Sequence, residues 1–209
     1  VGTDLGWSTK SVMYGHAMAL KADGPPGSLS LWAWGYNNEG QHGLGDTTNR
    51  SSPVLVNAGP WNLVGAGGNF SIAIKGPGYG GGSTSDLSKT RAGSTGAKYY
   101  EAKTTSAVGF GVNELWAMGA NYQGGLGTGN TTTRSSPVQV NSMTDYGIID
   151  LGISTSGNFV VKSDGTLWSW GNGGDGKLGH GTTNIHLSTP TQIGTDTDWT
   201  KVASGDDHT

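Results

Sequence analysis

The chain has 209 residues, and its 12 lysines and arginines stand against 15 aspartates and glutamates, for a formal net charge of −3. This acidic balance argues against a nucleic-acid-binding surface, and the absence of cysteine excludes a disulfide framework or a cysteine-rich zinc site. No apolar run reaches the length of a transmembrane helix. The 39 glycines and 8 tryptophans favour a fold of short strands and tight turns.

The chain begins with residues 7–24 (WSTKSVMYGHAMALKADG), a segment that contains two short apolar runs. These residues are similar to the second half of a unit that recurs further along the chain. The first complete unit opens at Leu31 with LWAWG, and later copies open at Leu115 with LWAMG and at Leu167 with LWSWG. A unit repeated along the sequence indicates one supersecondary structure stacked against copies of itself.

Each unit opens with a strand-like run that ends in glycine, followed by glycines at offsets of five, eight and ten residues. The closing glycines are Gly35, Gly119 and Gly171, and those that follow are Gly40, Gly43, Gly45, Gly124, Gly127, Gly129, Gly176, Gly179 and Gly181. The tryptophans of the opening runs are Trp32, Trp34, Trp116, Trp168 and Trp170. Alternation along such a run puts apolar groups on both faces, which predicts a strand buried on both sides.

Three further segments complete the unit. A proline, expected to be the first residue of a strand, precedes a short alternating run at Pro53, Pro137 and Pro190. An aromatic residue comes next, with a β-branched residue three positions later and a glycine six positions later, at Trp61, Tyr146 and Trp199. An apolar run ending in lysine closes the unit, and an Asp-Gly hairpin at 164–165 joins it to the next opening strand. The pattern predicts an all-β fold of β-propeller blades, each with four antiparallel strands.

The stretch LWAWGYNNEGQHGLG, the KSDGTLWSWG hairpin and the W-x-x-V-x-x-G segment resemble the repeats of the regulator-of-chromosome-condensation (RCC1) family. The resemblance covers nearly the whole chain except residues 76–106. Because members are seven-bladed propellers, it implies that the three to four blades seen here belong to a larger ring of the seven-bladed type. His42 departs from the pattern, since the other copies have Leu126 and Leu178 at its position, and Lys75 is not followed by Asp-Gly.

The expected organisation is one propeller segment over residues 1–209, with repeats near 7–60, 61–145 and 146–198 and a partial repeat over 199–209. The chain opens at Val1 without an initiator methionine, and both of its ends fall within a repeat. The last residues, WTKVASGDDHT, are expected to stop inside a strand. Propellers close with about four to eight blades, so we expect either a segment of a longer chain or a ring completed by further copies.

Residues 76–106 form a Gly/Ser-rich insertion between two parts of the second unit. The insertion is locally basic and contains aromatic residues, which are plausible contact anchors on a protruding loop. The candidate partner-binding residues are Arg91, Lys98, Tyr99 and Tyr100. The alternative is a flexible hairpin, which the glycine and serine content alone would predict.

Residues capable of catalysis or metal binding form no recognisable pattern. The histidines (His16, His42, His180, His186 and His208) are dispersed, with no pair at metal-ligand spacing, so no metal and no cofactor are expected. The family resemblance implies structural hydrogen bonds within a blade for His16 and His208, whereas His42 is interpreted as a tolerated turn residue. The glycine clusters lie between strands and not before a helix, which favours turns over phosphate-binding loops. No catalytic residue is predicted.

Two arginines precede Ser-Ser-Pro at equivalent places, Arg50 in the first unit and Arg134 in the second. Repetition at a structural position favours a contact between blades over a binding site.

The function expected from these observations is a non-catalytic interaction or structural module that presents propeller loops to a protein or glycan partner. The Thr/Asn/Gly-rich, cysteine-free composition favours a bacterial extracellular or virion structural protein. The resemblance implies two alternatives, guanine-nucleotide exchange on a small GTPase and secreted enzyme inhibition. Neither a nucleic-acid partner nor a membrane span is expected.

Overall fold

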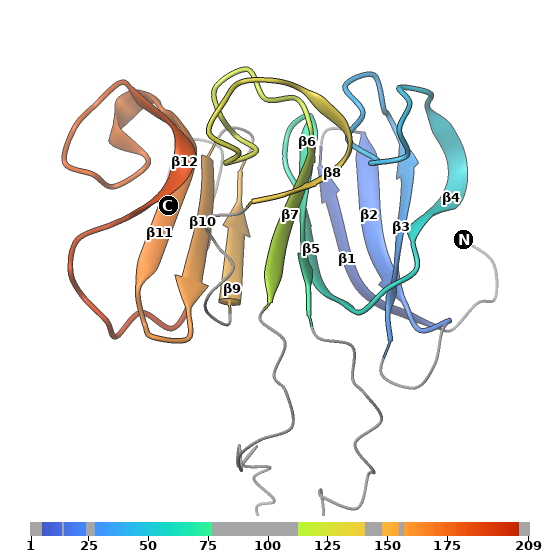
Figure 1. Ribbon diagram of the computed structural model, residues 1–209, viewed down its shortest axis with the longest axis horizontal. Helices are drawn as coiled ribbons and strands as arrows, with labels where there is room; N and C mark the ends of the chain where they lie inside the picture. Colours follow the sequence, from blue (N-terminus) through green and yellow to red (C-terminus); the bar gives the residue numbers. More distant parts are fainter. Residues whose placement is uncertain are drawn as a thin grey trace, which may run out of the picture.

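The computed structural model describes residues 6–13, 15–23, 28–76, 113–140, 148–154 and 157–204, and its strands form three four-stranded antiparallel sheets (Figure 1). The first sheet contains β1 (Trp7–Met13), β2 (His16–Lys21), β3 (Ser30–Gly35) and β4 (Arg50–Asn57). The second contains β5 (Trp61–Ala66), β6 (Phe70–Lys75), β7 (Glu114–Gly119) and β8 (Arg134–Gln139). The third contains β9 (Ile148–Ile153), β10 (Gly157–Lys162), β11 (Leu167–Gly173) and β12 (Ile185–Gln192), with a single 3-10 turn, η3 (Gly174–Gly176), after β11. The prediction of blades with four antiparallel strands is confirmed.

The three sheets stand side by side, with the first strands of successive sheets in contact (Figure 1). Strand β5 packs against β1 and β2 of the first sheet, and β9 packs against β5. The last strands, β4, β8 and β12, are the opposite edges of their sheets. We call the packing of the first sheet on the second the first joint, and that of the second sheet on the third the second joint.

Alternation along the opening strands fills both joints with apolar side chains, as the sequence predicts. In β7, Leu115 and Ala117 lie in the core cluster that joins the second and third sheets. The side chains that alternate with them, Trp116 and Met118, pack in the cluster that joins the first and second sheets. The middle sheet is therefore buried on both faces, which is the arrangement expected of a propeller blade.

The prolines do not begin their strands, which corrects the expectation from the sequence. Pro53 lies inside β4, and Pro137 and Pro190 lie inside β8 and β12. In the first sheet the pairing of β3 with β4 is irregular between Ala33 and Gly35, opposite the segment that contains the proline. An edge strand with a bulge tolerates proline, because no ladder hydrogen bond needs the missing donor there.

Two further expectations concern the third sheet. The hairpin at Asp164 and Gly165 forms between β10 and β11, where the Gly165 amide donates 2.9 Å to the Lys162 carbonyl. The strand expected from Trp199 onward is not present in residues 199–204, the described part of that segment. Instead, the Val202 amide donates to the Asp150 carboxylate at 2.7 Å. The segment after β12 is therefore bonded to a side chain of β9.

Candidate interaction surface

The loops that follow β3, β7 and β11 carry the repeated glycines along one rim of the molecule, the upper rim in Figure 1. All nine glycines at the fixed offsets have positive φ, between 70° and 82°. Residues with a Cβ rarely adopt this backbone conformation, so the spacing of the glycines follows from the turns of the loop. Both flanking elements are strands, which is the context of a turn and not of a phosphate-binding loop.

The first and second glycine loops each close on the outer strand of the next sheet. The Gly45 amide donates 2.8 Å to the Ser135 carbonyl of β8 across the first joint. The Gly129 amide donates 2.7 Å to the Ser188 carbonyl of β12 across the second joint. The corresponding glycine of the third loop, Gly181, has open space around the position of a Cβ. The two joints therefore use one hydrogen-bonding scheme, whereas no described residue packs against Gly181 of the third loop.

A buried asparagine organises each of the first two loops from within. Asn37 donates 3.1 Å to the carbonyls of Asp46 and Thr48 and accepts 2.8 Å from the His42 amide. Asn121 makes the same contacts in the second loop, including a 2.9 Å bond accepted from the Leu126 amide. These bonds satisfy backbone groups that the loop removes from water. The loops are therefore held as rigid supports for the side chains on the rim.

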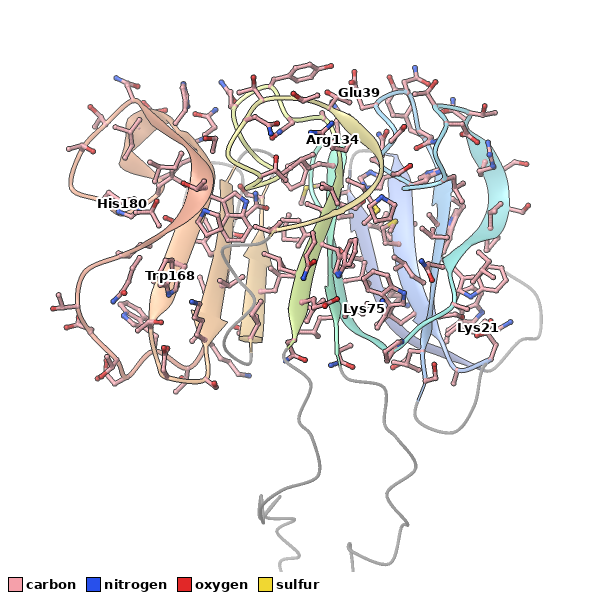
Figure 2. All side chains as sticks on the ribbon, viewed as in Figure 1. Lys21, Glu39, Lys75, Arg134, Trp168 and His180 are labelled. Carbon is pink, nitrogen blue, oxygen red and sulfur yellow. The ribbon has the colours of Figure 1, made fainter. Side chains whose placement is uncertain are left out.

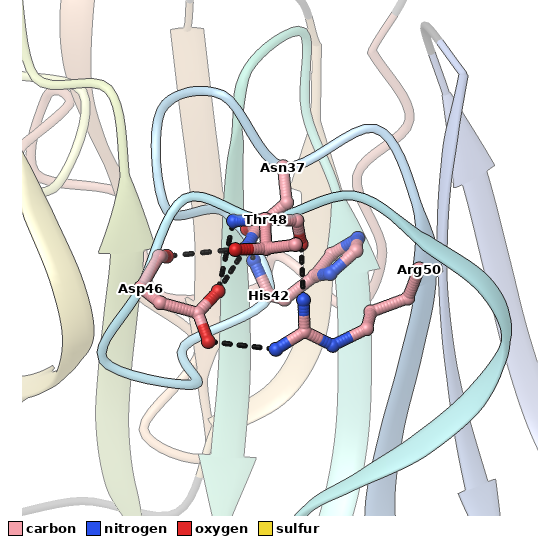
Figure 3. A network of polar contacts seen from close by, with 5 residues as sticks. All are labelled: Asn37, His42, Asp46, Thr48 and Arg50. Carbon is pink, nitrogen blue, oxygen red and sulfur yellow. Dashed lines mark hydrogen bonds and ion pairs between the residues drawn. The ribbon is translucent and has the colours of Figure 1, made fainter.

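The first loop adds an ion pair to this asparagine network (Figure 3). The Arg50 guanidinium contacts the Asp46 carboxylate at 2.6 Å and donates 2.7 Å to the Thr48 carbonyl. The Thr48 amide and the Arg50 side chain hold the pKa of Asp46 below its usual value. The hydrogen bonds of Arg50 thus stay within its own loop, and the contact between blades expected of Arg50 and Arg134 stays a prediction for Arg134.

An exposed cluster of two tyrosines and a carboxylate crosses the first joint at this rim, and we call it the rim patch. Tyr36 and Glu39 come from the loop after β3, and Tyr122 comes from the loop after β7. Tyr36 is 39% exposed and Tyr122 is 67% exposed. The Glu39 carboxylate, which lies at the upper rim in Figure 2, is close enough to Tyr122 to raise the pKa of its phenol.

The sequence did not single out the rim patch, because its tyrosines are not equivalent in the repeat. Tyr36 follows Gly35 directly, whereas Tyr122 is three residues after Gly119. A comparison of the units position by position therefore does not group the two tyrosines. Their proximity results from the packing of one loop beside the next.

The opposite edge of the sheets carries a row of lysine–tryptophan pairs (Figure 2). The lysine that ends the second strand of each sheet lies over a tryptophan of the third strand. The distances from Nζ to the ring centroid are 5.0 Å for Lys21 and Trp32, 5.7 Å for Lys75 and Trp116, and 4.0 Å for Lys162 and Trp168. Such cation–π contacts stabilise the strand ends. Lys75 pairs with Glu114 at the ends of β6 and β7, between which the insertion lies in the sequence.

Two histidines meet a serine inside the first joint. His16 Nε2 lies 3.0 Å from the Ser71 hydroxyl of the second sheet, and the His16 and His42 rings are 6.5 Å apart. Burial, followed by the neighbouring His42, lowers the pKa of His16 to about 4. The hydrogen bond of His16 therefore joins two blades, which corrects the expectation of a bond within one blade. His42 lies in a turn, as interpreted, but it is fully buried.

The remaining predicted residues are placed as follows. Arg91, Lys98, Tyr99, Tyr100 and His208 lie outside the described residues. Trp61 and Trp170 are buried, and Trp199 is 39% exposed. The described ranges contain no group of three His, Asp or Glu side chains able to hold a metal ion. Within the same ranges, no helix has the length and apolar character needed to cross a membrane.

Comparison with protein families identifies the repeat. A model described as "Regulator of chromosome condensation (RCC1) repeat" matches residues 30–74, 113–161 and 164–209. The first match begins at β3 of the first sheet and runs into β6 of the second, and the second match runs from β7 into β10. Each of these repeats therefore crosses a joint and links two sheets covalently.

The chain spans less than half the length of the curated relatives that it matches. The chain is 27% identical over 193 residues to the E3 ubiquitin-protein ligase HERC2 of Mus musculus, which covers 80% of this chain and 4% of the ligase. It is 25% identical over 190 residues to the ultraviolet-B receptor UVR8 of Arabidopsis thaliana, covering 79% of this chain and 41% of the receptor.

Solved structures show the same fold. The chain resembles Prp20p from Saccharomyces cerevisiae with a TM-score of 0.68 and 14% identity, over 96% of this chain and 41% of that one. It resembles human WBSCR16 with a TM-score of 0.62 and 17% identity, over 90% of this chain and 39% of that one. Since the family model matches most of the sequence, the chain belongs to the regulator of chromosome condensation (RCC1) repeat family.

Proposed function

We propose that this RCC1-like propeller segment is a non-catalytic module that binds a protein partner through the rim patch and the insertion at residues 76–106. Propellers of this family serve mainly in protein interactions. One related structure is of yeast RCC1 (Prp20) bound to Kap60, and another describes binding of Prp20p to Gsp1p and histones. These partners belong to the relative, and they support a protein as the class of partner here.

The rim patch is the observation that carries this proposal. Tyr36 and Tyr122 are large exposed side chains on loops that internal hydrogen bonds hold rigid. Rigid aromatic residues dominate binding energy at protein interfaces because they bury a large area at low entropic cost. The Glu39 carboxylate between them suits a lysine or arginine side chain, which would gain a cation–π contact together with an ion pair.

The insertion supplies the second proposed contact region through Arg91, Lys98, Tyr99 and Tyr100. Arginine and tyrosine are among the residues enriched at binding hot spots. Lys75 and Glu114, which flank this segment in the sequence, lie at the edge opposite the glycine loops. The two proposed contact regions can therefore be tested independently.

The unused faces of the end sheets support the proposal that this chain works within a larger ring. Gly176 and Gly181 of the third loop lack the close neighbours that Gly40 and Gly45 have in β8. At the other end of the segment, Ser51 and Ser52 of β4 are exposed. The residue of β12 equivalent to Ser51 is Ser188, whose carbonyl accepts a hydrogen bond from the Gly129 amide in the loop of the second sheet. Further blades, from a longer chain or from other copies, would use the same hydrogen bonds.

Four finer expectations stay predictions. A bacterial extracellular or virion setting rests on composition, and a glycan is the alternative to a protein as the partner. Guanine-nucleotide exchange on a small GTPase is tested by nucleotide release, and secreted enzyme inhibition by an assay of β-lactamase activity.

The decisive experiment places a photo-crosslinking amino acid at position 122 and, as a control, at position 55. Leu55 is also exposed but lies on β4, away from the rim loops. The partner identified by mass spectrometry is then purified for affinity measurements. A Tyr36→Ser/Tyr122→Ser variant should weaken binding by about tenfold or more, and Leu55→Ser by less than about twofold.

An alanine scan of the four insertion residues completes this test. Loss of affinity in that scan alone would assign binding to the insertion and remove the rim patch from the proposal. Unchanged affinity in both sets of variants would show that the proposed function is wrong.

A further inference from the structure

We propose that the first joint is an acid-sensitive joint, which opens as the pH falls because His16 and His42 take up protons between the first and second sheets. The joint brings together side chains from three elements. His16 begins β2, His42 lies in the loop after β3, and Ser71 belongs to β6 of the next sheet. All three side chains are at most 1% exposed.

The geometry of the pair disfavours an additional proton, because most of its ring nitrogens are buried and make no hydrogen bond. His16 Nε2 uses the Ser71 hydroxyl at 3.0 Å, and His16 Nδ1 and both ring nitrogens of His42 are buried without a hydrogen-bond partner. The ring centroids lie 6.5 Å apart, so two positive charges would repel each other in a dry environment. An imidazolium at His16 would lose its hydration, and the backbone groups of Met13 and Phe70, which favour the protonated form, weigh less than this burial.

The second joint provides an internal comparison, because the same three positions there do not titrate. Phe70 takes the place of His16 in the pairing with the third strand, and Leu126 takes the place of His42 in the loop. Asn158 takes the place of Ser71 and donates 2.8 Å to the Gly125 carbonyl. Phe70 and Leu126 belong to the apolar cluster of that joint. At these three positions, the first joint thus has two ionisable imidazoles and the second joint has none.

The charged groups around the pair do not rescue its protonated form. Burial is the main reason that the pKa of His42 is lowered, and it outweighs the Trp34 backbone, which raises the pKa. The Arg50 charge lowers it further, whereas Asp46 acts in the opposite direction. Arg50 and Asp46 are bonded to each other at 2.6 Å, which leaves the carboxylate engaged. For His16, the neighbouring charge that shifts the pKa is that of His42 itself.

The direction of the pH dependence follows from the sign of these shifts. A histidine with a lowered pKa in the folded state favours the closed joint when it is neutral. The stabilisation that neutral His16 gives to the closed joint is complete above the ordinary pKa of 6.5. This stabilisation is lost progressively as the pH falls from 6.5 to about 4. For His16 alone, this corresponds to an increase of about 100-fold in the opening equilibrium between pH 7 and pH 4.

Opening of this joint would also separate the two halves of the rim patch. Tyr36 and Glu39 belong to the first sheet's loop and Tyr122 to the second sheet's loop. Acid release of a partner from that patch rests on the proposed function. The acid sensitivity of the joint does not, and it can be measured without a partner.

Hydrogen exchange of two matched amides tests the proposal directly in the native protein. The Gly45 amide bonds across the first joint and the Gly129 amide across the second. After correction for the intrinsic exchange rate, the protection of Gly45 should fall by about 100-fold from pH 7 to pH 4. The protection of Gly129 should fall by less than about tenfold. An equal fall at the two amides would overturn the proposal.

A variant that carries the side chains of the second joint provides the matched control. The substitutions His16→Phe, His42→Leu and Ser71→Asn together should remove most of the pH dependence at Gly45. An unchanged pH profile in that variant would contradict the proposal.

Titration of the two imidazole rings by NMR in the unmodified protein gives an answer even if the variant does not fold. His16 should titrate near pH 4, and His42 should titrate below 6.5. Values at or above 6.5 for both rings would overturn the proposal.

Discussion

Gly40 lies against the backbone of Ser135 in the next sheet, so closely that a Cβ built on the glycine would be 2.5 Å from Ser135 Cα. Gly124 has the same relation to Ser188, where the distance is also 2.5 Å. The equivalent Gly176 has no atom closer than 3.7 Å to that position. The glycines at this offset thus serve both the turn and the packing of neighbouring sheets.

This difference separates two costs that a glycine substitution usually combines. Gly40→Ala and Gly176→Ala both force alanine into positive φ, at a cost of about 1–2 kcal/mol. Only Gly40→Ala also pushes a methyl group into Ser135, which should add about 2 kcal/mol or more. Urea unfolding of the two variants gives the comparison, and equal losses in unfolding free energy would refute the role of Gly40 in packing.

The asparagine at the centre of the second loop should be important for stability. Asn121→Ala removes the donor to the Asn130 and Thr132 carbonyls and the acceptor of the Leu126 amide. Because some of these groups are then left without partners away from water, we expect a loss of about 3 kcal/mol in the free energy of unfolding. Thr133→Ala, an exposed position in the same loop, should change it by less than about 0.5 kcal/mol.

Two tryptophans at equivalent positions should respond differently to the same change. Trp170 is fully buried at the second joint and donates 2.9 Å to the Gly125 carbonyl, whereas Trp34 is partly exposed on the outer face of the first sheet. Trp170→Phe should cost about 2 kcal/mol through the lost hydrogen bond and the cavity, and Trp34→Phe less than about 1 kcal/mol. Thermal unfolding measures both. A larger cost at Trp34 would contradict this account of the joint.

The carboxylate of Asp46 offers a test of the network around Arg50. Arg50→Gln should raise the pKa of Asp46 and still leave it below its usual value, because the Thr48 amide continues to donate to the carboxylate. A carboxylate with a lowered pKa contributes stability that is present above its ordinary pKa of 3.8 and lost as the pH falls further. NMR titration of the carboxyl carbon measures the shift. An unchanged pKa would show that the ion pair has no effect on this group.

The repeat itself was readable from the sequence, because turns and strands impose local requirements. Positive φ demands glycine at fixed places in each loop, which produces the offsets that continue from Gly40 to Gly181. Alternation in LWAWG and its copies likewise reports a strand that is buried on both faces. These features depend on a few neighbouring residues, so the residues alone determined the all-β class, the four strands in each unit and the family resemblance.

Only the tertiary structure decided which residues meet across the joints. His16 and Ser71 are far apart in the sequence and occupy different positions in the repeat, as do Tyr36 and Tyr122 in the rim patch. The structure also decided the partner of Arg50. Its repetition suggested a contact between blades, but its partner Asp46 lies in its own loop. Alignment of the units identifies what each sheet shares with the others. Contacts between sheets depend on how two sheets pack together, and that packing is not a property of any single repeat.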